Sequence, residues 1–191
     1  MRIVVVISGR GSNLIALHRN ARPETYQIVG VISSRADAAG LAYARAQGLP
    51  TRVIETSTYR ERTAYDAALA AAIDGFTPDL IALAGFMRIL TEAFVTRYAG
   101  RLINIHPSLL PAFPGLDTHR RALQAGVREH GATVHYVSPV VDGGPIIDQA
   151  RLAVDPTESP EKLAARVLAL EHALYPAVLT RLAAAHRDTP R

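Results

Sequence analysis

Along the first half of the chain, short apolar segments alternate with longer segments of helical spacing. The short segments are rich in β-branched residues and end at polar or glycine-containing turns, as buried strands do. They predict strands at 3–8, 28–33, 52–55 and 80–84. The longer segments predict helices at 13–19, 36–47 and 59–73, the last opened by Thr58 and Glu61 as a capping box. This alternation is typical of a parallel sheet with helices on both faces.

The pattern of the second half is different. A fifth strand, 101–105, leads into a loop at 106–115 whose prolines are incompatible with a helix interior or a central strand. Two later strands, 132–137 and 146–154, are separated by a hairpin-like connection at 138–145. We therefore expect an antiparallel edge on the sheet.

Two further helices complete the pattern, a short one near 119–124 and a long one from Ser159 to about His186. Ser159 is suited to the N-cap, and Pro160 is suited to the first helical position. A chain of 191 residues can bury one sizeable core. We expect a single α/β domain at 1–186 with a Rossmann-like open twisted sheet, parallel in its N-terminal half, followed by a flexible tail at 187–191.

Composition limits the chemistry and the partners. The chain has no cysteine, which excludes disulfides, thiolate nucleophiles and zinc sites built on sulfur. The net charge is +4, but the basic residues, all arginine except Lys162, are scattered and indicate no nucleic-acid surface. No apolar run is expected to reach the ~18 residues of a membrane span, and the N-terminal run is too short for a signal peptide. We expect a cytoplasmic protein.

The first candidate for chemistry is the segment 8–14, Ser-Gly-Arg-Gly-Ser-Asn-Leu, between the first strand and the first helix. A glycine turn and a helix N-terminus there offer backbone N–H groups to a phosphate, with Ser12 and Asn13 as side-chain donors. A tight turn with two capping side chains is the alternative. A dinucleotide fingerprint is incomplete because Leu14 stands where its third glycine belongs, and no Gly-Lys-Ser/Thr is present for a Walker loop.

The second candidate is the end of the fifth strand. Alternation along a strand places Asn104 and His106 on one side and turns Ile105 into the core. An amide that donates to an oxyanion and an imidazole that manages a proton are suited to acyl transfer. Open α/β sheets also bind their ligands at the carboxyl ends of strands.

The third candidate is the sequence Asp142-Gly143-Gly144-Pro145. Such a sequence is ordinary in turns, because aspartate caps its own turn and glycine adopts positive φ. If the loop folds over the fifth strand, Asp142 would pair with His106 and stabilise the imidazolium. The sequence leaves both interpretations open.

Other chemistries have less support in the sequence. There is no His-Glu-x-x-His and no pairing of His130 or His135 at helical spacing, so we expect no metal site. The absence of Gly-x-Ser-x-Gly disfavours a serine nucleophile. Direct attack by a substrate amine is then the simplest route. The segment 85–90 offers apolar surface and one cation, which fits either a pocket for a flat ring or core packing.

Together these segments resemble those of phosphoribosylglycinamide formyltransferases, within the superfamily of folate-dependent formyl-transferring enzymes. The resemblance covers residues 1 to about 182 and follows the family's order. It is carried by 8–14, by 84–90 (Ala-Gly-Phe-Met-Arg-Ile-Leu), by 104–111 (Asn-Ile-His-Pro-Ser-Leu-Leu-Pro), by 130–135 (His-Gly-Ala-Thr-Val-His) and by 142–145.

The resemblance implies a role for each matching residue. It makes Asn104, His106 and Asp142 the catalytic set. It assigns substrate binding to Gly11, Ser12, Asn13 and Glu171. It assigns the walls of the folate site to Arg62, Met87, Arg88, Ile89, Leu90, Val137 and Val141. Arg10 stands where some relatives carry asparagine, and its role is left open.

The implied reaction moves a formyl group from 10-formyltetrahydrofolate to the amine of glycinamide ribonucleotide in purine synthesis, without a metal. The implied partners are these two substrates, and the protein would be a monomer or a homodimer. One alternative is a hydrolase that releases formate from the same folate with the same catalytic set. Another is a nucleotide-binding module or an NADP-dependent reductase that uses Arg35 for the 2′-phosphate.

Overall fold

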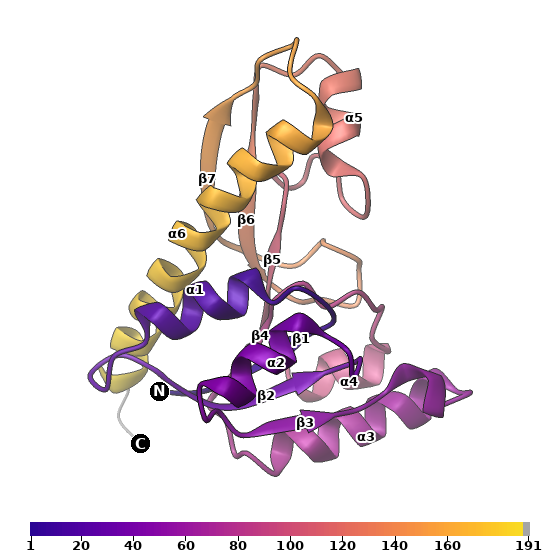
Figure 1. The fold of residues 1–191 in the computed structure, drawn as a ribbon, viewed down its shortest axis with the longest axis vertical. Coiled ribbons are helices and arrows are strands. Elements are labelled where there is room, and N and C mark those ends of the chain that lie inside the picture. Colours follow the sequence, from indigo (N-terminus) through magenta and orange to yellow (C-terminus); the bar gives the residue numbers. More distant parts are fainter. Residues whose placement is uncertain (189–191) are drawn as a thin grey trace.

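The computed structural model describes residues 1–188 of the chain. Its seven-stranded sheet has the order β3-β2-β1-β4-β5-β6-β7, in which β1 to β5 run parallel and β6 and β7 are antiparallel to their neighbours (Figure 1). The strands are β1 (Arg2–Ile7), β2 (Gln27–Ser33), β3 (Thr51–Val53), β4 (Leu80–Leu83), β5 (Leu102–His106), β6 (Glu129–Tyr136) and β7 (Ile146–Ala153). The expected parallel sheet with an antiparallel edge is confirmed.

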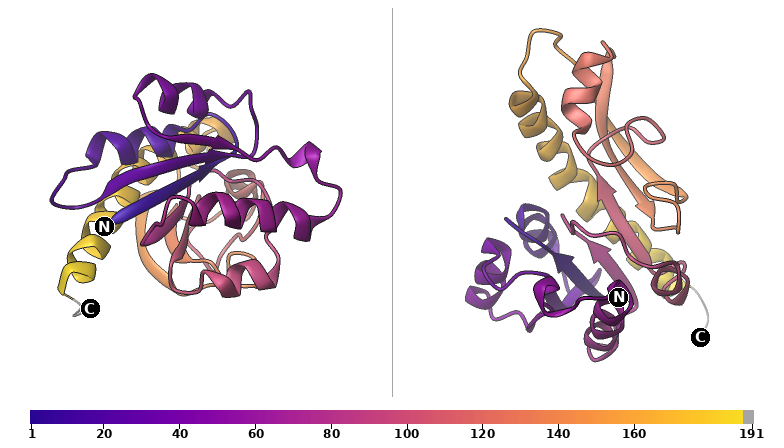
Figure 2. Two further views of the ribbon diagram at one scale, coloured as in Figure 1. Left: turned by 90° about the horizontal axis from the view of Figure 1, so that it is seen from below. Right: turned by 90° about the vertical axis from the view of Figure 1, so that its right-hand side faces the viewer.

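Helices cover both faces of the sheet (Figure 2). They are α1 (Ser12–Asn20), α2 (Ala39–Ala46), α3 (Arg62–Asp74), α4 (Glu92–Arg97), α5 (Thr118–Gln124) and α6 (Pro160–Asp188), with a 3₁₀ turn, η1 (Thr56–Thr58). One buried cluster joins β1 to α1 and α6, and a second joins the other face of β1 to α3 and α4. The alternation in β1 explains this division, because Val5 and Ile7 belong to the first cluster and Val4 and Val6 to the second.

Two points of local structure differ from the prediction. Thr58 and Glu61 form no capping box, because Thr58 ends η1 and Glu61 is itself the N-cap of α3, without a side-chain cap bond. Helix α4 was not predicted at all. Helix α6 begins as expected, with Ser159 Oγ accepting from Lys162 N at 3.3 Å, and it ends at Asp188, close to the expected end near His186. The rest of the expected tail, 189–191, lies outside the described residues.

The expectation that no segment resembles a membrane span also needs correction, since α6 is long and apolar enough by length and composition alone. In this structure α6 is a core helix that packs on β6 and β7 beside α1 (Figure 1). Its buried side chains include Leu163, Val167, Tyr175 and Val178. The hydroxyl of Tyr175 donates to the carbonyl of Leu83 at 3.0 Å, which ties α6 to the centre of the sheet.

Candidate active site

The order of the strands reverses between β1 and β4, and three segments of interest follow the carboxyl ends of neighbouring strands there. Residues 8–13 follow β1, residues 84–90 follow β4, and His106 ends β5. Ligands of open α/β sheets bind at such a switch point, because the connections diverge to opposite faces and leave a crevice. The candidate site is therefore where the fold itself favours one.

His106 is buried and each of its ring nitrogens faces an oxygen. Nε2 lies 3.0 Å from the carbonyl of Phe113, and Nδ1 lies 3.4 Å from Asp142 Oδ2. The contact between His106 and Asp142, which the sequence left conditional, is therefore present. The 138–145 connection brings Asp142 over β5.

Asn104 has a partner that sequence analysis did not assign to the site. Asn104 lies opposite His135 in the β5–β6 pairing, and its Nδ2 lies 3.3 Å from His135 Nε2. His135 Nδ1 faces the carbonyl of Tyr136 at 2.9 Å, so Nδ1 carries the hydrogen and Nε2 accepts from Asn104. Burial lowers the pKa of His135, which favours this neutral ring. His135 thus fixes the direction of the Asn104 amide.

The loop that carries Asp142 is held in an unusual conformation. Asp142 has φ 51°, in the left-handed region that non-glycine residues rarely adopt. Its Oδ2 accepts from the backbone N–H of Gly115 at 2.8 Å, and Oδ1 lies 3.7 Å from His135 Nε2. A Cβ on Gly144 would lie 1.8 Å from the carbonyl oxygen of Tyr136. Glycine at position 144 therefore allows this loop to pack closely on β6, in addition to its role in the turn.

The segment after β1 has the geometry expected of a phosphate-binding loop. Gly11 caps α1 in the left-handed conformation with φ 73°, and the first helical bond runs from Ile15 N to Gly11 O. The N–H groups of the first turn consequently point out of the helix N-terminus. The loop is tightly supported, because Gly40 N donates to Gly9 O at 3.1 Å and a Cβ on Gly11 would lie 2.4 Å from Gly40 Cα.

The Asn13 side chain is not a free donor, contrary to expectation. It is buried, and its Nδ2 donates to Glu171 Oε2 at 2.6 Å. Burial raises the pKa of Glu171, while the bond from Asn13 and the charge of Arg10 act in the opposite direction. Asn13 therefore joins the loop to α6 and places the Glu171 carboxylate beside it.

Most residues matched to a folate site lie on two segments, 84–90 and 137–141. Leu90 and Val137 are partly buried against the second buried cluster, which includes side chains of α3 and α4. Met87, Ile89 and Val141 are exposed. The guanidinium of Arg88 lies 4.6 Å from the ring centre of Tyr65 in α3, and Arg62, at the start of α3, is exposed. Both segments thus pack on the second buried cluster and expose apolar side chains to the outside.

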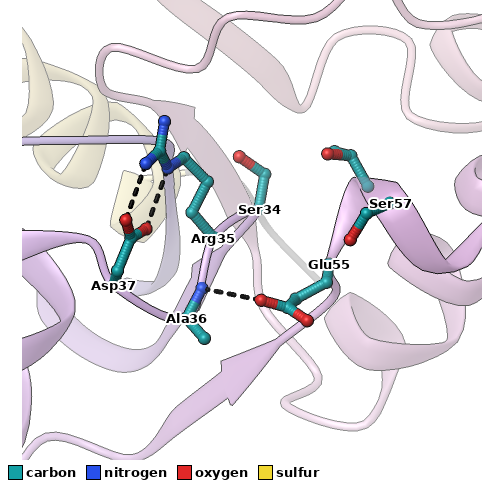
Figure 3. A pocket seen from close by; sticks show the side chains of 7 residues that line it. Ser34, Arg35, Ala36, Asp37, Glu55 and Ser57 are labelled. Atoms are coloured by element: carbon teal, nitrogen blue, oxygen red, sulfur yellow. Dashed lines mark hydrogen bonds and ion pairs between the residues drawn. The ribbon is translucent and has the colours of Figure 1, made fainter.

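A polar cavity of about 370 Å³ lies at the carboxyl ends of β2 and β3 (Figure 3). Arg35, which an NADP-binding interpretation would assign to a phosphate, is already paired with Asp37 through two bonds of 2.9 and 2.7 Å. Glu55 also lines the cavity and accepts from the backbone of Ala36 at 3.3 Å. A cavity whose only cation is already paired and whose lining also includes the Glu55 carboxylate is unsuited to a phosphate, so the structure does not favour the NADP interpretation.

The fold and the site together define a class, the doubly wound α/β proteins that bind at the switch point of the sheet. A family model described as formyl transferase matches residues 1–179. The chain therefore belongs to the formyl transferase family. Within the residues that the structure describes, no group of histidine and carboxylate side chains could hold a metal ion.

Named relatives cover nearly the whole chain. The phosphoribosylglycinamide formyltransferase of Escherichia coli (strain K12) is 50% identical over 182 residues, which are 94% of this chain and 86% of that protein. A solved phosphoribosylglycinamide formyltransferase from Coxiella burnetii has a TM-score of 0.92 and 50% identity, covering 97% of this chain and 88% of that one. The Brucella melitensis enzyme has a TM-score of 0.90 and 49% identity, covering 96% and 95%.

Proposed function

We propose that this protein transfers the formyl group of 10-formyltetrahydrofolate to the amine of glycinamide ribonucleotide, a step of purine biosynthesis. The observation that carries the proposal is the meeting of Asn104, His106 and Asp142 at β5, beside a loop suited to phosphate. The similarity to enzymes named phosphoribosylglycinamide formyltransferase supports the identity of the amine substrate. The same similarity supports a cytoplasmic location.

In this proposal the two substrates occupy opposite sides of the catalytic set. The phosphate of the ribonucleotide binds the N–H groups at Gly11, Ser12 and Asn13, and Glu171 accepts hydrogen bonds from the rest of that substrate. The folate lies against Arg62 and the two apolar segments. The lining side chains of these segments are Met87, Arg88, Ile89, Leu90, Val137 and Val141.

The chain's residues act on the tetrahedral intermediate that forms when the amine attacks the formyl carbon. Asn104 has a second amide hydrogen besides the one directed at His135, and it donates this hydrogen to the oxyanion. His106 exchanges its contact with the Phe113 carbonyl for the oxyanion, to which Nε2 donates, while Asp142 stays on Nδ1. The attacking amine loses a proton, and His106 or an ordered water carries that proton to the departing folate nitrogen.

The test mixes the purified protein with glycinamide ribonucleotide and 10-formyltetrahydrofolate and follows the absorbance of deformylated folate. We expect product only when both substrates are present. Product in the absence of the amine would instead identify the formyltetrahydrofolate hydrolase, which uses water with the same catalytic set. No turnover under either condition would contradict the proposal.

A further inference from the structure

The segment 85–90 has little hydrogen-bonded structure of its own, although it supplies much of the proposed folate site. It contains no helix or strand, and Gly85 adopts φ 75° where the chain leaves β4. The backbone N–H of Met87 donates to Ser8 Oγ at 3.1 Å. Met87 and Ile89 are more than half exposed. A segment of this kind depends on anchors elsewhere for a defined conformation.

Helix α3 provides such anchors at the far end of the segment. Asp66 is 4% exposed, and its Oδ2 accepts from the backbone N–H of Thr91 at 2.7 Å. The neighbouring Tyr65 is fully buried and carries Arg88 over its ring. Two successive residues of α3 therefore hold both ends of the stretch from Arg88 to Thr91.

The face of α3 that carries Asp66 also holds α4, through residues one and two turns further along α3. Asp66, Ala70 and Asp74 are spaced four residues apart, so they share one face of the helix. The hydroxyl of Tyr98 donates to Ala70 O and to Asp74 Oδ1, and Arg97 pairs with Asp74. The contacts of Ala70 and Asp74 fix α4, whereas the contact of Asp66 with Thr91 fixes the segment that precedes α4.

We propose that Asp66 is a positioning residue for the folate-binding segment: its carboxylate fixes the backbone at Thr91 and, with Tyr65 on Arg88, holds the segment in the conformation that accepts the folate. This inference rests on the proposed function. A hydrogen bond to a carboxylate is stronger than one between neutral groups, and removing a buried acceptor leaves its donor unsatisfied. Loss of the carboxylate therefore weakens the folate side, whereas the phosphate loop keeps its own support from Gly40 N on Gly9 O.

The experiment compares Michaelis constants for the two substrates in variants of the full chain. Asp66→Ala raises the KM for 10-formyltetrahydrofolate about tenfold or more and changes the KM for glycinamide ribonucleotide less than about twofold. Asp66→Asn keeps an acceptor oxygen and restores most of the folate affinity. Asp74→Ala, the matched control, lowers the thermal midpoint without raising the folate KM.

A second pair of variants tests the same bond from the donor side. Thr91 has φ −71°, which proline adopts, so Thr91→Pro removes the N–H together with the side-chain cap on Phe94. Thr91→Ala removes only the cap. We expect a higher folate KM in Thr91→Pro than in Thr91→Ala. If Asp66→Ala is insoluble, the comparison of these two variants tests the inference instead.

Three results would overturn the inference while the proposed function stands. One is an unchanged folate KM in folded Asp66→Ala, and another is equal folate KM values in Thr91→Pro and Thr91→Ala. The third is an equal rise in Asp74→Ala, which would mean that general destabilisation of α3 is responsible. Absence of turnover in the unmodified protein is a different result, because it contradicts the proposed function and this inference with it.

Discussion

Asp142 contacts three separate parts of the chain with one carboxylate. It accepts from Gly115 N and faces the rings of His106 and His135. Gly115 lies in a loop, and the two histidines lie on two strands. Tertiary contacts therefore fix the orientation of the Asp142 carboxylate. The left-handed backbone at Asp142 is thus a strained conformation at a site where it brings reacting groups together.

Loss of the Asn104 amide should lower turnover as much as loss of the His106 imidazole. Asn104→Ala and His106→Ala each remove a donor to the oxyanion, and loss of one such donor typically lowers turnover about 10²–10³-fold. We expect kcat to fall by that amount while circular dichroism stays unchanged. Near-normal turnover in either folded variant would contradict the assigned roles.

Arg10 is the other residue with a testable role. It is exposed, and its charge reaches Glu171 beside the phosphate loop. Arg10→Gln should raise the KM for glycinamide ribonucleotide several-fold at low ionic strength, and the difference should shrink in salt because exposed charges are screened within about 10 Å at 0.1 M. Arg45→Gln, the same change at an exposed position in α2, should leave that KM and its salt dependence unaltered.

Among the elements, the strands and most helices were predictable, whereas η1 and α4 were not. The strand β1 and the helix α6 carry strong patterns of apolar spacing, whereas α4 has six residues, fewer than two turns, and no period can be recognised in so short a helix. The capping box failed because η1 occupies the residues that would begin the helix.

The candidate site was predictable only where it lies within one element. Alternation along β5 placed Asn104 and His106 together. Sequence does not give the register between β5 and β6, so His135 was missed as the partner of Asn104. The contact of Asp142 depends on the path of a loop, which local residue preferences do not determine.

The loop 138–145 yields a prediction at the scale of the element. In Gly144→Ala a methyl group would need the space of the Tyr136 carbonyl oxygen, 1.8 Å away, and this carbonyl also accepts from His135. We expect the loop to shift, kcat to fall at least tenfold and the thermal midpoint to drop. Gly75→Ala is the control, because Gly75, like Gly144, has no positive φ and its Cβ would make no contact shorter than 3.4 Å. An equal or smaller loss of kcat in Gly144→Ala than in Gly75→Ala would contradict the role of close packing.

Across the whole molecule, buried histidines link stability to pH. Burial lowers the pKa of His119, His135 and His172, and it lowers the pKa of His130 to about 4, with neighbouring His119 and His106 adding to the effect. Between pH 6.5 and about 4 the unfolded chain binds a proton at His130 that the folded chain does not bind. The free energy of unfolding therefore decreases as pH falls through this range.

The variant His130→Phe removes that linkage. We expect its free energy of unfolding in urea to fall less steeply between pH 7 and pH 4.5 than that of the unmodified protein, whatever the difference at neutral pH. His18→Phe is a suitable control at a partly exposed histidine of α1. Parallel curves for the unmodified protein and His130→Phe would contradict the assignment.

The bond between Asn13 and Glu171 joins residues that are 158 positions apart. During translation Asn13 therefore leaves the ribosome long before Glu171 does. The nascent chain can assemble its parallel sheet and still lack the carboxylate beside the loop. In the proposed function, the side of the site that takes the phosphorylated amine is therefore complete only after α6 has been made and has docked. A ribosome stalled before α6 would hold the loop without its carboxylate.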